Sequence, residues 1–471
     1  MNRSLTKIVC TIGPASGDKE TLLKMYEAGM SVARLNFSHG TPEQHLEFIK
    51  NIRETEKNVA GFIGILGDLQ GPKIRIGKLK EEQYYLKSGD TLKITVKDIV
   101  GTKEIVSTTY KHLVKDVSIG DIILIDDGNL RLKVINKTQD TVECKVLNNA
   151  VIKPHKGINI PGVELSTPSI TEKDIEYIKF AVENDLDFLA VSFVRKPEDI
   201  LLVKQHLKGS PIKVIAKIER PEALECIEEI VEVSDGVMVA RGDLGIEIPL
   251  ERVPFEQKRI ISIPNAKNKF VITATQMLES MIEHPTPTRA EITDIANAIL
   301  DGTDAIMLSG ETSAGKYPVL AVETMARVAK TAEKHIKPIS INDILQEKLK
   351  ERSDFAISFS AAAISHLLDV KYIVAFTKSG HTALLISKQK PATKILTFTT
   401  ETKVARQCAA YRGVVPILSD EVNSLDDIFE FLSPYLKNTG FAESGDKVVL
   451  TMGIPFGQPG TTNLLHVMTI K

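Results

Sequence analysis

Short runs of apolar residues alternate with longer amphipathic stretches at the start of the chain. The apolar runs are rich in β-forming residues and cover 7–13, 31–37 and 62–68. Between them, residues 18–28 and 42–58 repeat their apolar side chains at helical spacing. Asp18 stands where a helix N-cap is expected, and Gly29 stands where the same helix would end. This alternation predicts βα units and therefore a parallel sheet.

A different pattern occupies residues 71–168. It consists of short alternating strands separated by turn sequences rich in Gly, Asp and Asn. The clearest strands are 91–96, 122–125, 130–135 and 141–147. We interpret this segment as a β-rich insertion. Helical periodicity resumes at Thr171, where Asp174 completes a capping-box pattern three residues later.

Five more strand-like runs follow the insertion, again with helical stretches between them. They are residues 187–193, 213–218, 235–240, 270–275 and 305–309. Three runs before the insertion and five after it make eight, the number in a (β/α)₈ TIM barrel. The alternative is a doubly wound open sheet, which normally carries a GxGxxG fingerprint after its first strand. The sequence there is TIGPAS, so the barrel is favoured.

A third unit begins near residue 341 and again alternates helices with strands. At about 150 residues per domain, the length of 471 residues agrees with three domains. The predicted domains are a discontinuous barrel at 1–70 and 169–340, an inserted lid at 71–168, and a C-terminal α/β domain at 341–471.

Composition narrows the class of protein. The chain is 43% hydrophobic and 25% charged, and 59 Lys and Arg against 61 Asp and Glu leave a formal charge of −2. These values exclude a disordered, collagen-like or coiled-coil protein. A near-neutral chain also lacks the basic field that nucleic-acid and anionic-membrane binders carry. Any anion must therefore be held by a few local cations.

Targeting signals and metal-binding cysteine pairs are not found. The first apolar run is too short for a signal peptide, and no stretch approaches the roughly 18 apolar residues of a membrane span. The sequence has no CxxC pair, which argues against a disulfide framework and a structural zinc site. These features predict a cytoplasmic location. The four cysteines are Cys10, Cys144, Cys226 and Cys408.

Polar residues gather at the ends of the predicted barrel strands, where TIM barrels place their active sites. They are Arg34, Asn36, Ser38 and His39 after the second strand, Asp68 at the third, Ser192 at the fourth, Lys217 and Glu219 at the fifth, Arg241, Gly242 and Asp243 after the sixth, Thr275 at the seventh, and Ser309, Gly310 and Glu311 at the eighth.

Glu219 and Asp243 would stand on adjacent strand ends. Two carboxylates so placed can share a hard divalent cation, Mg²⁺ or Mn²⁺, and leave positions open for substrate oxygens. The alternative is that each acid pairs with a neighbouring arginine, Arg220 or Arg241. For the two acids together, beside Lys217, we favour the metal site.

Lys217 interrupts the apolar strand VIAKIE, where an unpaired ammonium is costly to bury. It could neutralise a phosphoryl group during transfer, which depends mainly on positioning and electrostatics. A structural salt bridge to Glu219 or Asp243 is the alternative. The amide groups near Gly242 could hold an anion if a helix starts there, and a plain turn is the competing interpretation.

Several stretches together resemble the pyruvate kinase family. They are TIGPAS at 11–16, ARLNFSHG at 33–40, GDLQGPKIR at 67–75, KIE at 217–219, MVARGDLGIEIP at 238–249, ATQMLESM at 274–281, PTRAE at 287–291 and IMLSGET at 306–312. The resemblance implies a (β/α)₈ barrel with an inserted β-barrel lid and a C-terminal α/β regulatory domain. It implies transfer of phosphate from phosphoenolpyruvate to ADP, giving pyruvate and ATP in the last step of glycolysis.

The resemblance also implies roles for the strand-end residues. Lys217 would stabilise the transferring phosphoryl group, and Glu219 with Asp243 would hold Mg²⁺. The backbone at Gly242 and Asp243 would bind the substrate carboxylate, and Thr275 would orient a water that delivers a proton to the enolate. Further predicted contacts are Arg34 and Arg75 to phosphate, Ser192 to the substrate, and Pro14, Asn36, His39, Arg75 and Lys156 to the nucleotide.

One departure concerns potassium. Potassium-requiring members carry TKGPEIRT after the third strand, whereas this chain reads LQGPKIRI at 69–76. Lys73 replaces the acid and could supply the positive charge of the ion, so potassium is not expected to be required. The alternative is that Lys73 points to solvent and the ion still binds. By resemblance, the pocket for that ion comprises Asn36, Ser38, Asp68 and Leu69.

The last domain resembles the family's effector-binding domain. A loop between a strand and a helix start would bind a sugar phosphate or nucleotide monophosphate that activates the enzyme, although a capped turn without a ligand has the same sequence features. Residues 455–463 match the loop that covers this site. The resemblance implies a homotetramer, and we expect the chain to lack the extra phosphohistidine-like domain of some bacterial relatives. The predicted effector residues are Thr377, Lys378, Ser379, Gly380, His381 and Thr382.

Two other functions share part of this pattern. A metal-dependent lyase acting on a pyruvate enolate would need the two carboxylates but neither Lys217 nor an ADP lid. A non-catalytic sugar-phosphate sensor would need only the last domain. The joint presence of Lys217, Glu219, Asp243 and Thr275 favours the kinase over both.

Overall fold

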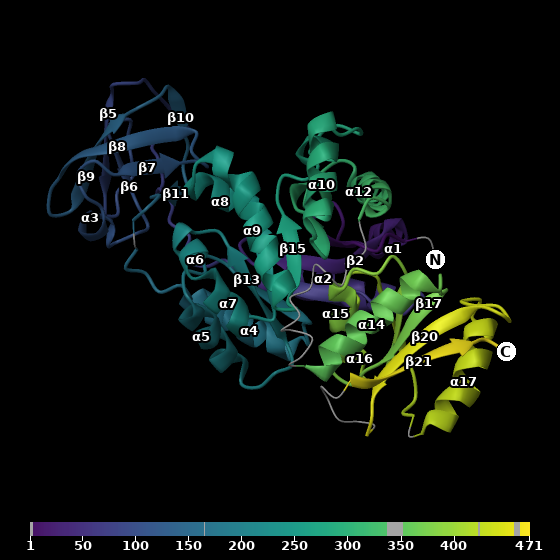
Figure 1. Cartoon of the computed structure of the whole chain (residues 1–471). Coiled ribbons are helices and arrows are strands. Elements are labelled where there is room, and N and C mark those ends of the chain that lie inside the picture. Colours follow the sequence, from purple (N-terminus) through teal and green to yellow (C-terminus); the bar gives the residue numbers. More distant parts are fainter. Residues whose placement is uncertain (1–2, 164, 337–351, 423, 456–461) are drawn as a thin grey trace.

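Eight parallel strands close into a barrel at the centre of the molecule (Figure 1). The computed structural model describes residues 3–163, 165–336, 352–422, 424–455 and 462–471. The order around the barrel is β1-β16-β15-β14-β13-β12-β3-β2, which confirms the predicted TIM barrel and excludes the open sheet. The strands are β1 (Lys7–Thr11), β2 (Met30–Asn36), β3 (Gly64–Asp68), β12 (Phe188–Val191), β13 (Lys213–Ile218), β14 (Gly236–Ala240), β15 (Phe270–Ala274) and β16 (Ala305–Leu308).

The barrel strands are apolar along their whole length because both of their faces are buried. In β1, Val9 belongs to the apolar cluster that also holds Val32 and Leu66 of the neighbouring strands. Ile8 and Cys10, which point the other way, belong to the cluster between the barrel and its helices. The continuous apolar runs in the sequence are therefore typical of this two-sided burial.

Helices surround the barrel, and their predicted caps are confirmed. The Asp18 side chain accepts a hydrogen bond from the Thr21 amide, and Gly29 ends that helix with φ of 136°. Thr171 and Asp174 form a complete capping box. The helices are α1 (Lys19–Ala28), α2 (Pro42–Glu56), α4 (Glu172–Glu183), α5 (Pro197–Leu207), α6 (Pro221–Glu225), α7 (Ile227–Val233), α8 (Arg241–Glu247), η1 (Leu250–Arg252), α9 (Val253–Ala266), η2 (Glu279–Ile282), α10 (Arg289–Asp301), α11 (Gly310–Ser313) and α12 (Pro318–Glu333).

The inserted lid lies between β3 and β12 in the chain and extends from one end of the barrel (Figure 1). Its six-stranded sheet has the order β11-β7-β8-β9-β5-β6, and β10 pairs with β4 in a second small sheet. The lid has an apolar core of its own, centred on residues such as Leu92, Leu132 and Val142. Its elements are β4 (Tyr84–Leu86), β5 (Thr91–Thr95), β6 (Ile105–Ser107), α3 (Leu113–Asp116), β7 (Ile122–Ile125), β8 (Leu130–Lys137), β9 (Thr141–Val146), β10 (Ala150–Ile152) and β11 (Ile158–Asn159).

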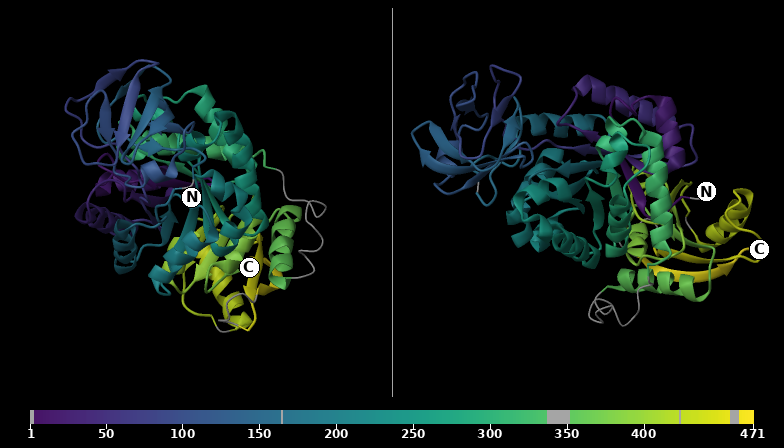
Figure 2. Two further views of the ribbon diagram at one scale, coloured as in Figure 1. Left: turned by 90° about the vertical axis from the view of Figure 1, so that its left-hand side faces the viewer. Right: turned by 90° about the horizontal axis from the view of Figure 1, so that it is seen from above.

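The C-terminal unit is a five-stranded sheet with the order β19-β18-β17-β20-β21, in which only β21 is antiparallel to its neighbour. It packs against the end of the barrel where the strands begin, away from the lid (Figures 1 and 2). Its elements are α14 (Ser353–Leu367), β17 (Tyr372–Phe376), α15 (His381–Lys388), β18 (Ile395–Thr399), α16 (Thr402–Cys408), β19 (Val414–Leu418), α17 (Leu425–Asn438), β20 (Lys447–Gly453) and β21 (Thr462–Thr469).

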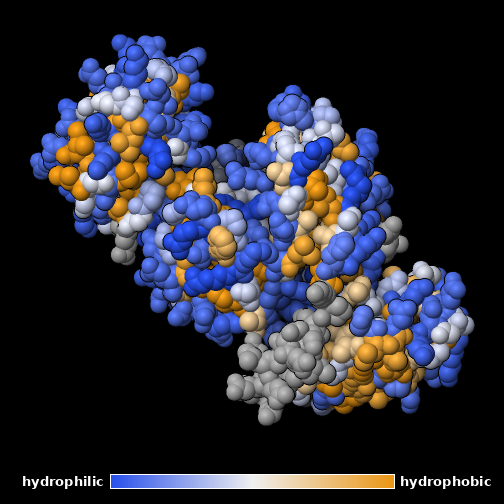
Figure 3. All heavy atoms as spheres, turned by 45° about the horizontal axis from the view of Figure 1, so that its top comes forward, coloured by the Kyte–Doolittle hydropathy of each residue, from blue (hydrophilic) through white to orange (hydrophobic). Residues whose placement is uncertain are grey.

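Hydrophilic side chains cover much of the face shown in Figure 3, and the surface is hollowed between the lid and the barrel. Among the helices that the structure describes, none combines the length and the apolar character needed to cross a membrane.

Candidate active site

The carboxyl ends of the barrel strands bring the predicted polar residues together around Lys217. Its ammonium nitrogen lies 2.8 Å from Oε1 of Glu219 and 3.3 Å from Oδ1 of Asp68. It also donates a hydrogen bond of 2.6 Å to the Ser192 hydroxyl. Burial alone would lower the pKa of Lys217, but the carboxylates of Asp68 and Glu219 raise it above its ordinary value. Lys217 therefore keeps its positive charge in a buried position.

Lys217 therefore forms the salt bridge with Glu219 that is the alternative to a role in phosphoryl transfer. This salt bridge does not exclude a role towards substrate, because the same ammonium also reaches Ser192 at the mouth of the barrel. The second carboxylate partner is Asp68, which lies on β3, far from Lys217 in the chain. Local spacing in the sequence does not pair these two residues.

Glu219, a carboxylate partner of Lys217, is 1% exposed. Its Oε2 accepts a hydrogen bond of 2.7 Å from the Phe193 amide. Burial raises the pKa of the Glu219 carboxyl to about 7 against the opposing charge of Lys217, and the nearby Asp243 adds to the rise. Oε1 faces the Lys217 ammonium but accepts no well-aligned hydrogen bond from the residues that the structure describes.

The arginine pairs weighed as the alternative to a metal site are not formed in the described part of the chain. Arg220 pairs with Glu222 and Glu247, and Arg241 pairs with Asp294 at 2.6 Å. Within that part, the carboxylates of Glu219 and Asp243 are therefore free of arginine partners.

These two carboxylates fit a hard divalent cation. Oε1 of Glu219 lacks a well-aligned hydrogen-bond donor among the described residues, and the negative charge of Asp243 lies near it. A divalent cation would accept the free oxygen as a ligand and would offset the two like charges. Within the described ranges, no group of three or more His, Cys, Asp or Glu side chains could hold a metal. The protein would supply two ligands, which leaves the remaining positions to water and substrate.

Arg34 lies beside this cluster, where β2 ends. Its Nε donates to Oδ2 of Asp68 at 2.7 Å, and a second guanidinium nitrogen donates to the Thr11 hydroxyl at 2.8 Å. Burial raises the pKa of Asp68, but Lys217 and Arg34 together hold it below its ordinary value. Asp68 therefore orients two cations at once. Thr11, at the end of β1, is a site residue that the sequence did not single out.

Gly242 and Thr275 meet across adjacent strand ends. The Gly242 amide donates a hydrogen bond of 2.7 Å to the Thr275 hydroxyl, which donates in turn to the Ala274 carbonyl at 2.6 Å. Thr275 has φ of 69°, a strained value for a β-branched residue. A Cβ at Gly242 would lie 3.3 Å from the Thr275 hydroxyl oxygen, so this close approach favours glycine. The first turn of α8 is thereby held against the end of β15.

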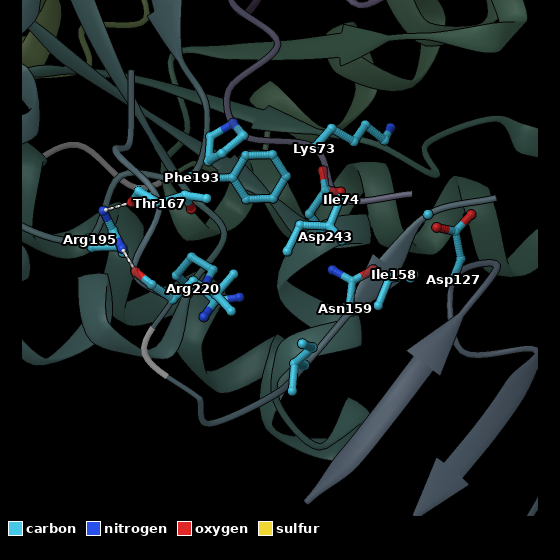
Figure 4. Close-up of a pocket in the computed structure, with 14 residues that line it drawn as sticks. Lys73, Ile74, Asp127, Ile158, Asn159, Thr167, Phe193, Arg195, Arg220 and Asp243 are labelled. Atoms are coloured by element: carbon cyan, nitrogen blue, oxygen red, sulfur yellow. Dashed lines mark hydrogen bonds between the residues drawn. The ribbon is translucent and has the colours of Figure 1, made fainter. Parts of the chain in front are cut away.

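A pocket between the lid and the barrel opens beside this cluster (Figure 4). Lys73 and Pro72 line it where the chain enters the lid, and Asp243 lies on its barrel side. The other residues that line it and are labelled in the figure are Ile74, Asp127, Ile158, Asn159, Thr167, Phe193, Arg195 and Arg220.

Comparison with known proteins decides the family. The family model described as "Pyruvate kinase, barrel domain" matches residues 3–322, and "Pyruvate kinase, alpha/beta domain" matches residues 355–468. The chain belongs to the pyruvate kinase family. It is 45% identical over 469 residues to a pyruvate kinase of Staphylococcus epidermidis, and 46% identical over 470 residues to one of Bacillus licheniformis. These matches cover 98% and 99% of this chain and 80% of each relative.

A solved structure supports the same family. A pyruvate kinase from Cryptosporidium parvum superimposes with a TM-score of 0.90 and 39% sequence identity, covering all of this chain and 96% of the other. The protein is accordingly a phosphotransferase that acts on phosphoenolpyruvate and ADP to form pyruvate and ATP. The lyase and the non-catalytic sensor are not supported by these matches.

The residues expected at the nucleotide of this pyruvate kinase lie around the mouth of the barrel and on the lid. Burial lowers the pKa of His39, and the charges of Lys73, Arg75 and Arg34 lower it further. Lys73 is exposed and lines the pocket. The positive charges of Lys73, Arg75 and Arg34 therefore act together on the surroundings of His39.

The remaining residues predicted for the nucleotide and potassium sites lie partly on the barrel and partly on the lid. Pro14 is exposed after β1, and the side-chain oxygen of Asn36 accepts a hydrogen bond from the Ser38 amide at 3.1 Å. On the lid, Lys156 pairs with Asp126 at 2.8 Å, and Arg75 donates to the His155 carbonyl at 2.8 Å. Leu69, from the expected potassium pocket, is 1% exposed.

The expected effector loop connects β17 to α15 in the C-terminal unit. Gly380 has φ of 81° and precedes α15, and its amide donates to the Thr377 hydroxyl at 3.0 Å. His381 contacts Asp354 at 2.9 Å, and the hydroxyl of Thr382 lies 2.6 Å from that of Thr462. Lys378 lines a shallow pocket with Glu401, Asp420 and Glu421, and Ser379 lies in the same loop. Residues 456–461 of the expected covering loop fall outside the described residues.

Proposed function

We propose that the strand-end cluster around Lys217 binds phosphoenolpyruvate and performs the phosphoryl transfer. The supporting observation is the buried ammonium of Lys217, which two carboxylates and Ser192 hold in its charged form. A fixed positive charge in a site with little water stabilises a transferring phosphoryl group more strongly than a solvated one. Ser192 orients this ammonium, and Arg34 binds the phosphate through its guanidinium fork.

The substrate carboxylate is assigned to the first turn of α8. The Gly242 amide donates to the Thr275 hydroxyl, which a second hydrogen bond also orients, and Asp243 is the next residue of the same turn. A threonine hydroxyl is a poor acid, so Thr275 orients the water that protonates the enolate at C3 rather than donating its own proton.

Members of the family generally use Mg²⁺, and Glu219 and Asp243 are the residues that would hold Mg²⁺ or Mn²⁺ here. When bound, the cation supplies positive charge next to the carboxylate and enolate oxygens of the substrate.

The nucleotide is assigned to the cleft between Pro14, Asn36, His39 and Arg75 on the barrel side and Lys156 on the lid. The positive field around His39 supports this placement, because it would attract the ADP phosphates. Lys156 would exchange its partner Asp126 for the nucleotide when the lid closes.

We propose that Lys73 replaces the potassium ion, so that the enzyme is active without potassium. The charge of Lys73, like that of Arg75, acts on His39, which follows shortly after two of the residues that match the family's potassium ligands, Asn36, Ser38, Asp68 and Leu69. A fixed ammonium there supplies the charge that the ion provides in other members.

Regulation is assigned to the C-terminal unit. The loop of Thr377, Lys378, Ser379, Gly380, His381 and Thr382 would bind a phosphorylated effector, a sugar phosphate or a nucleotide monophosphate. The loop lies between a strand and the first turn of α15, a helix start that favours phosphate. We also propose a homotetramer, a cytoplasmic location in keeping with four free cysteines, and the domain division 1–70 with 169–340, 71–168 and 341–471.

The Lys217→Met variant tests the catalytic assignment. Formation of ATP from phosphoenolpyruvate and ADP should fall by about a thousandfold, the size expected when a charged group that stabilises the transition state is removed. Lys204→Met, at a half-buried position of α5 where the lysine pairs with Asp235, serves as the control and should keep full turnover. If Lys217→Met folds and turns over at the wild-type rate, the assignment of Lys217 is wrong.

A further inference from the structure

Three side chains connect the lid to the barrel at a single carboxylate oxygen. Asn159, the last residue of β11 in the lid, donates to Oε1 of Glu247 at 3.0 Å. Arg220 donates to the same oxygen at 2.9 Å, and its other terminal nitrogen donates to the lid carbonyl of Val163 at 3.1 Å. Figure 4 shows Asn159 and Arg220 on two sides of the pocket. Asn159 and Val163 both lie on the segment by which the chain leaves the lid, so one arginine and one glutamate hold that segment against the barrel.

This contact is buried and strongly charged. The side chains of Arg220 and Glu247 are 5% and 1% exposed. Burial raises the pKa of Glu247, whereas Arg220 and the hydrogen bond from Asn159 oppose that rise. Oε2 of Glu247 has no hydrogen-bond partner among the described residues. A buried ion pair adds little net stability, but it fixes geometry because any displacement leaves a buried charge unpaired.

The two barrel residues of the contact lie close in the chain to the proposed metal ligands. Arg220 follows Glu219 directly, and Glu247 is the last residue of α8, whose first turn holds Asp243. The contact therefore fixes the lid relative to the two segments that carry Glu219 and Asp243. On the lid side, Lys156 precedes Asn159 by three residues, a span of about 10 Å in extended chain.

We propose that the shared oxygen of Glu247 is the pivot about which the lid turns. Asn159 stays bonded to it, while Lys156 swings across the cleft towards the nucleotide. Glu247 contacts no substrate and acts as a positioning residue. This inference rests on the proposed placement of ADP beneath the lid. Loss of the pivot leaves the lid with more orientations, so closing it over ADP costs more conformational entropy.

The Asn159→Ala variant tests the pivot. The KM for ADP should rise about three- to tenfold, with kcat within twofold and the KM for phosphoenolpyruvate unchanged, because the barrel alone holds that substrate. Asn149→Ala is the matched control, since the Asn149 side chain bonds only to the Ser88 amide within the described part of the lid. Its kinetics should equal those of the wild type.

A double-mutant cycle shows whether the effect passes through Glu247. Glu247→Ala should raise the KM for ADP, and adding Asn159→Ala to it should change that KM less than twofold further. Glu247→Gln, which keeps an acceptor oxygen for Asn159, should lie closer to the wild type than Glu247→Ala.

A distance measurement covers the case in which Glu247→Ala does not fold. Fluorophores placed at the exposed positions Lys133 on the lid and Glu198 on the barrel should show a broader range of distances in Asn159→Ala than in the wild type.

Several results would overturn the pivot. The first is that Asn159→Ala has the same KM for ADP as Asn149→Ala, or a lower one. The second is that Asn159→Ala lowers kcat while its KM for ADP is unchanged. The third is that the effects of Asn159→Ala and Glu247→Ala on the KM for ADP are additive. The Lys156→Ala variant separates this failure from failure of the nucleotide assignment. If Lys156→Ala raises the KM for ADP and Asn159→Ala does not, only the pivot is wrong; if neither does, the nucleotide placement is wrong.

Discussion

The Ser192 hydroxyl connects Lys217 to the end of β3, because it accepts a hydrogen bond from the ammonium at 2.6 Å and donates one to the Leu69 carbonyl at 2.8 Å. Both bonds are buried, and Ser192 is 3% exposed. The serine therefore fixes the direction of the Lys217 side chain.

Removing this hydroxyl should slow catalysis without unfolding the protein. A hydrogen bond to a charged group contributes about 1.5–3 kcal/mol, so Ser192→Ala should lower kcat by about 10- to 100-fold. Steady-state kinetics with coupled ATP detection measures the change. Ser262→Ala, which loses only a bond to the Arg259 carbonyl on α9, is the control and should have wild-type kcat. An unchanged kcat in Ser192→Ala would show that Lys217 needs no such support.

Potassium dependence should follow the charge at residue 73. The wild type should be fully active in buffer free of sodium and potassium, whereas Lys73→Glu should need potassium and be activated by it at least about tenfold, because the acid removes the fixed positive charge. Lys78→Glu makes the same charge change at another exposed position of the lid and should stay independent of potassium. A strict potassium requirement in the wild type contradicts the prediction.

The ion pair between Lys388 and Asp304 should hold the C-terminal unit on the barrel. Their charged atoms lie 2.5 Å apart, and both side chains are 1% exposed. Lys388→Met leaves Asp304 as an unpaired buried charge and should lower the free energy of unfolding by about 3–5 kcal/mol. Adding Asp304→Asn should recover part of that loss.

Chemical denaturation measures these free energies. Lys316→Met breaks an exposed pair with Glu283, whose side chains are 63% and 62% exposed, and should leave the free energy of unfolding nearly unchanged. Equal effects of Lys388→Met and Lys316→Met would show that the buried pair does not anchor the unit.

The stability of the barrel should fall in mild acid through His45. Burial lowers the pKa of His45 from its ordinary value of 6.5, and the ring packs against Phe37 and Tyr177. The unfolded chain then binds a proton near pH 6.5 that the folded protein does not bind. The free energy of unfolding is therefore highest above pH 6.5 and decreases as the pH falls below it.

Denaturation curves at about pH 7.5 and about pH 5.5 measure this slope. His45→Gln cannot titrate and should lose less stability between these two values than the wild type. Gln205→Ala, on the outer helix α5, is the control because it removes no ionisable group, and it should match the wild-type slope. Identical slopes in all three proteins would show that His45 does not contribute.

Effector binding should depend on Lys378. A sugar phosphate or nucleotide monophosphate should shift the half-saturation for phosphoenolpyruvate, and Lys378→Ala should remove that shift while leaving the activity without effector intact. Lys371→Ala, in the same unit but outside the loop, should retain the response. Saturation curves that no effector changes would contradict the proposal.

Local pattern predicted most of the fold. Apolar runs with helices between them indicate parallel strands buried on both faces. Their number, eight, favours a barrel over an open sheet. The caps at Asp18 and Thr171 depend on contacts within three residues, so spacing reveals them. Lys217 and Glu219 are two residues apart, and the alternation of side chains along an extended chain therefore places both on the same side at the end of β13.

The sequence by itself therefore determined the class of fold, the order of its domains and the residues at the strand ends. Only the tertiary structure decided which of these residues touch. Lys217 meets Asp68, and Asn159 meets Glu247, because barrel closure and lid docking bring distant segments together. Such partners follow from the geometry of the closed sheet and not from local spacing. A linear pattern reports which face of an element is buried, and it does not report what lies opposite that face.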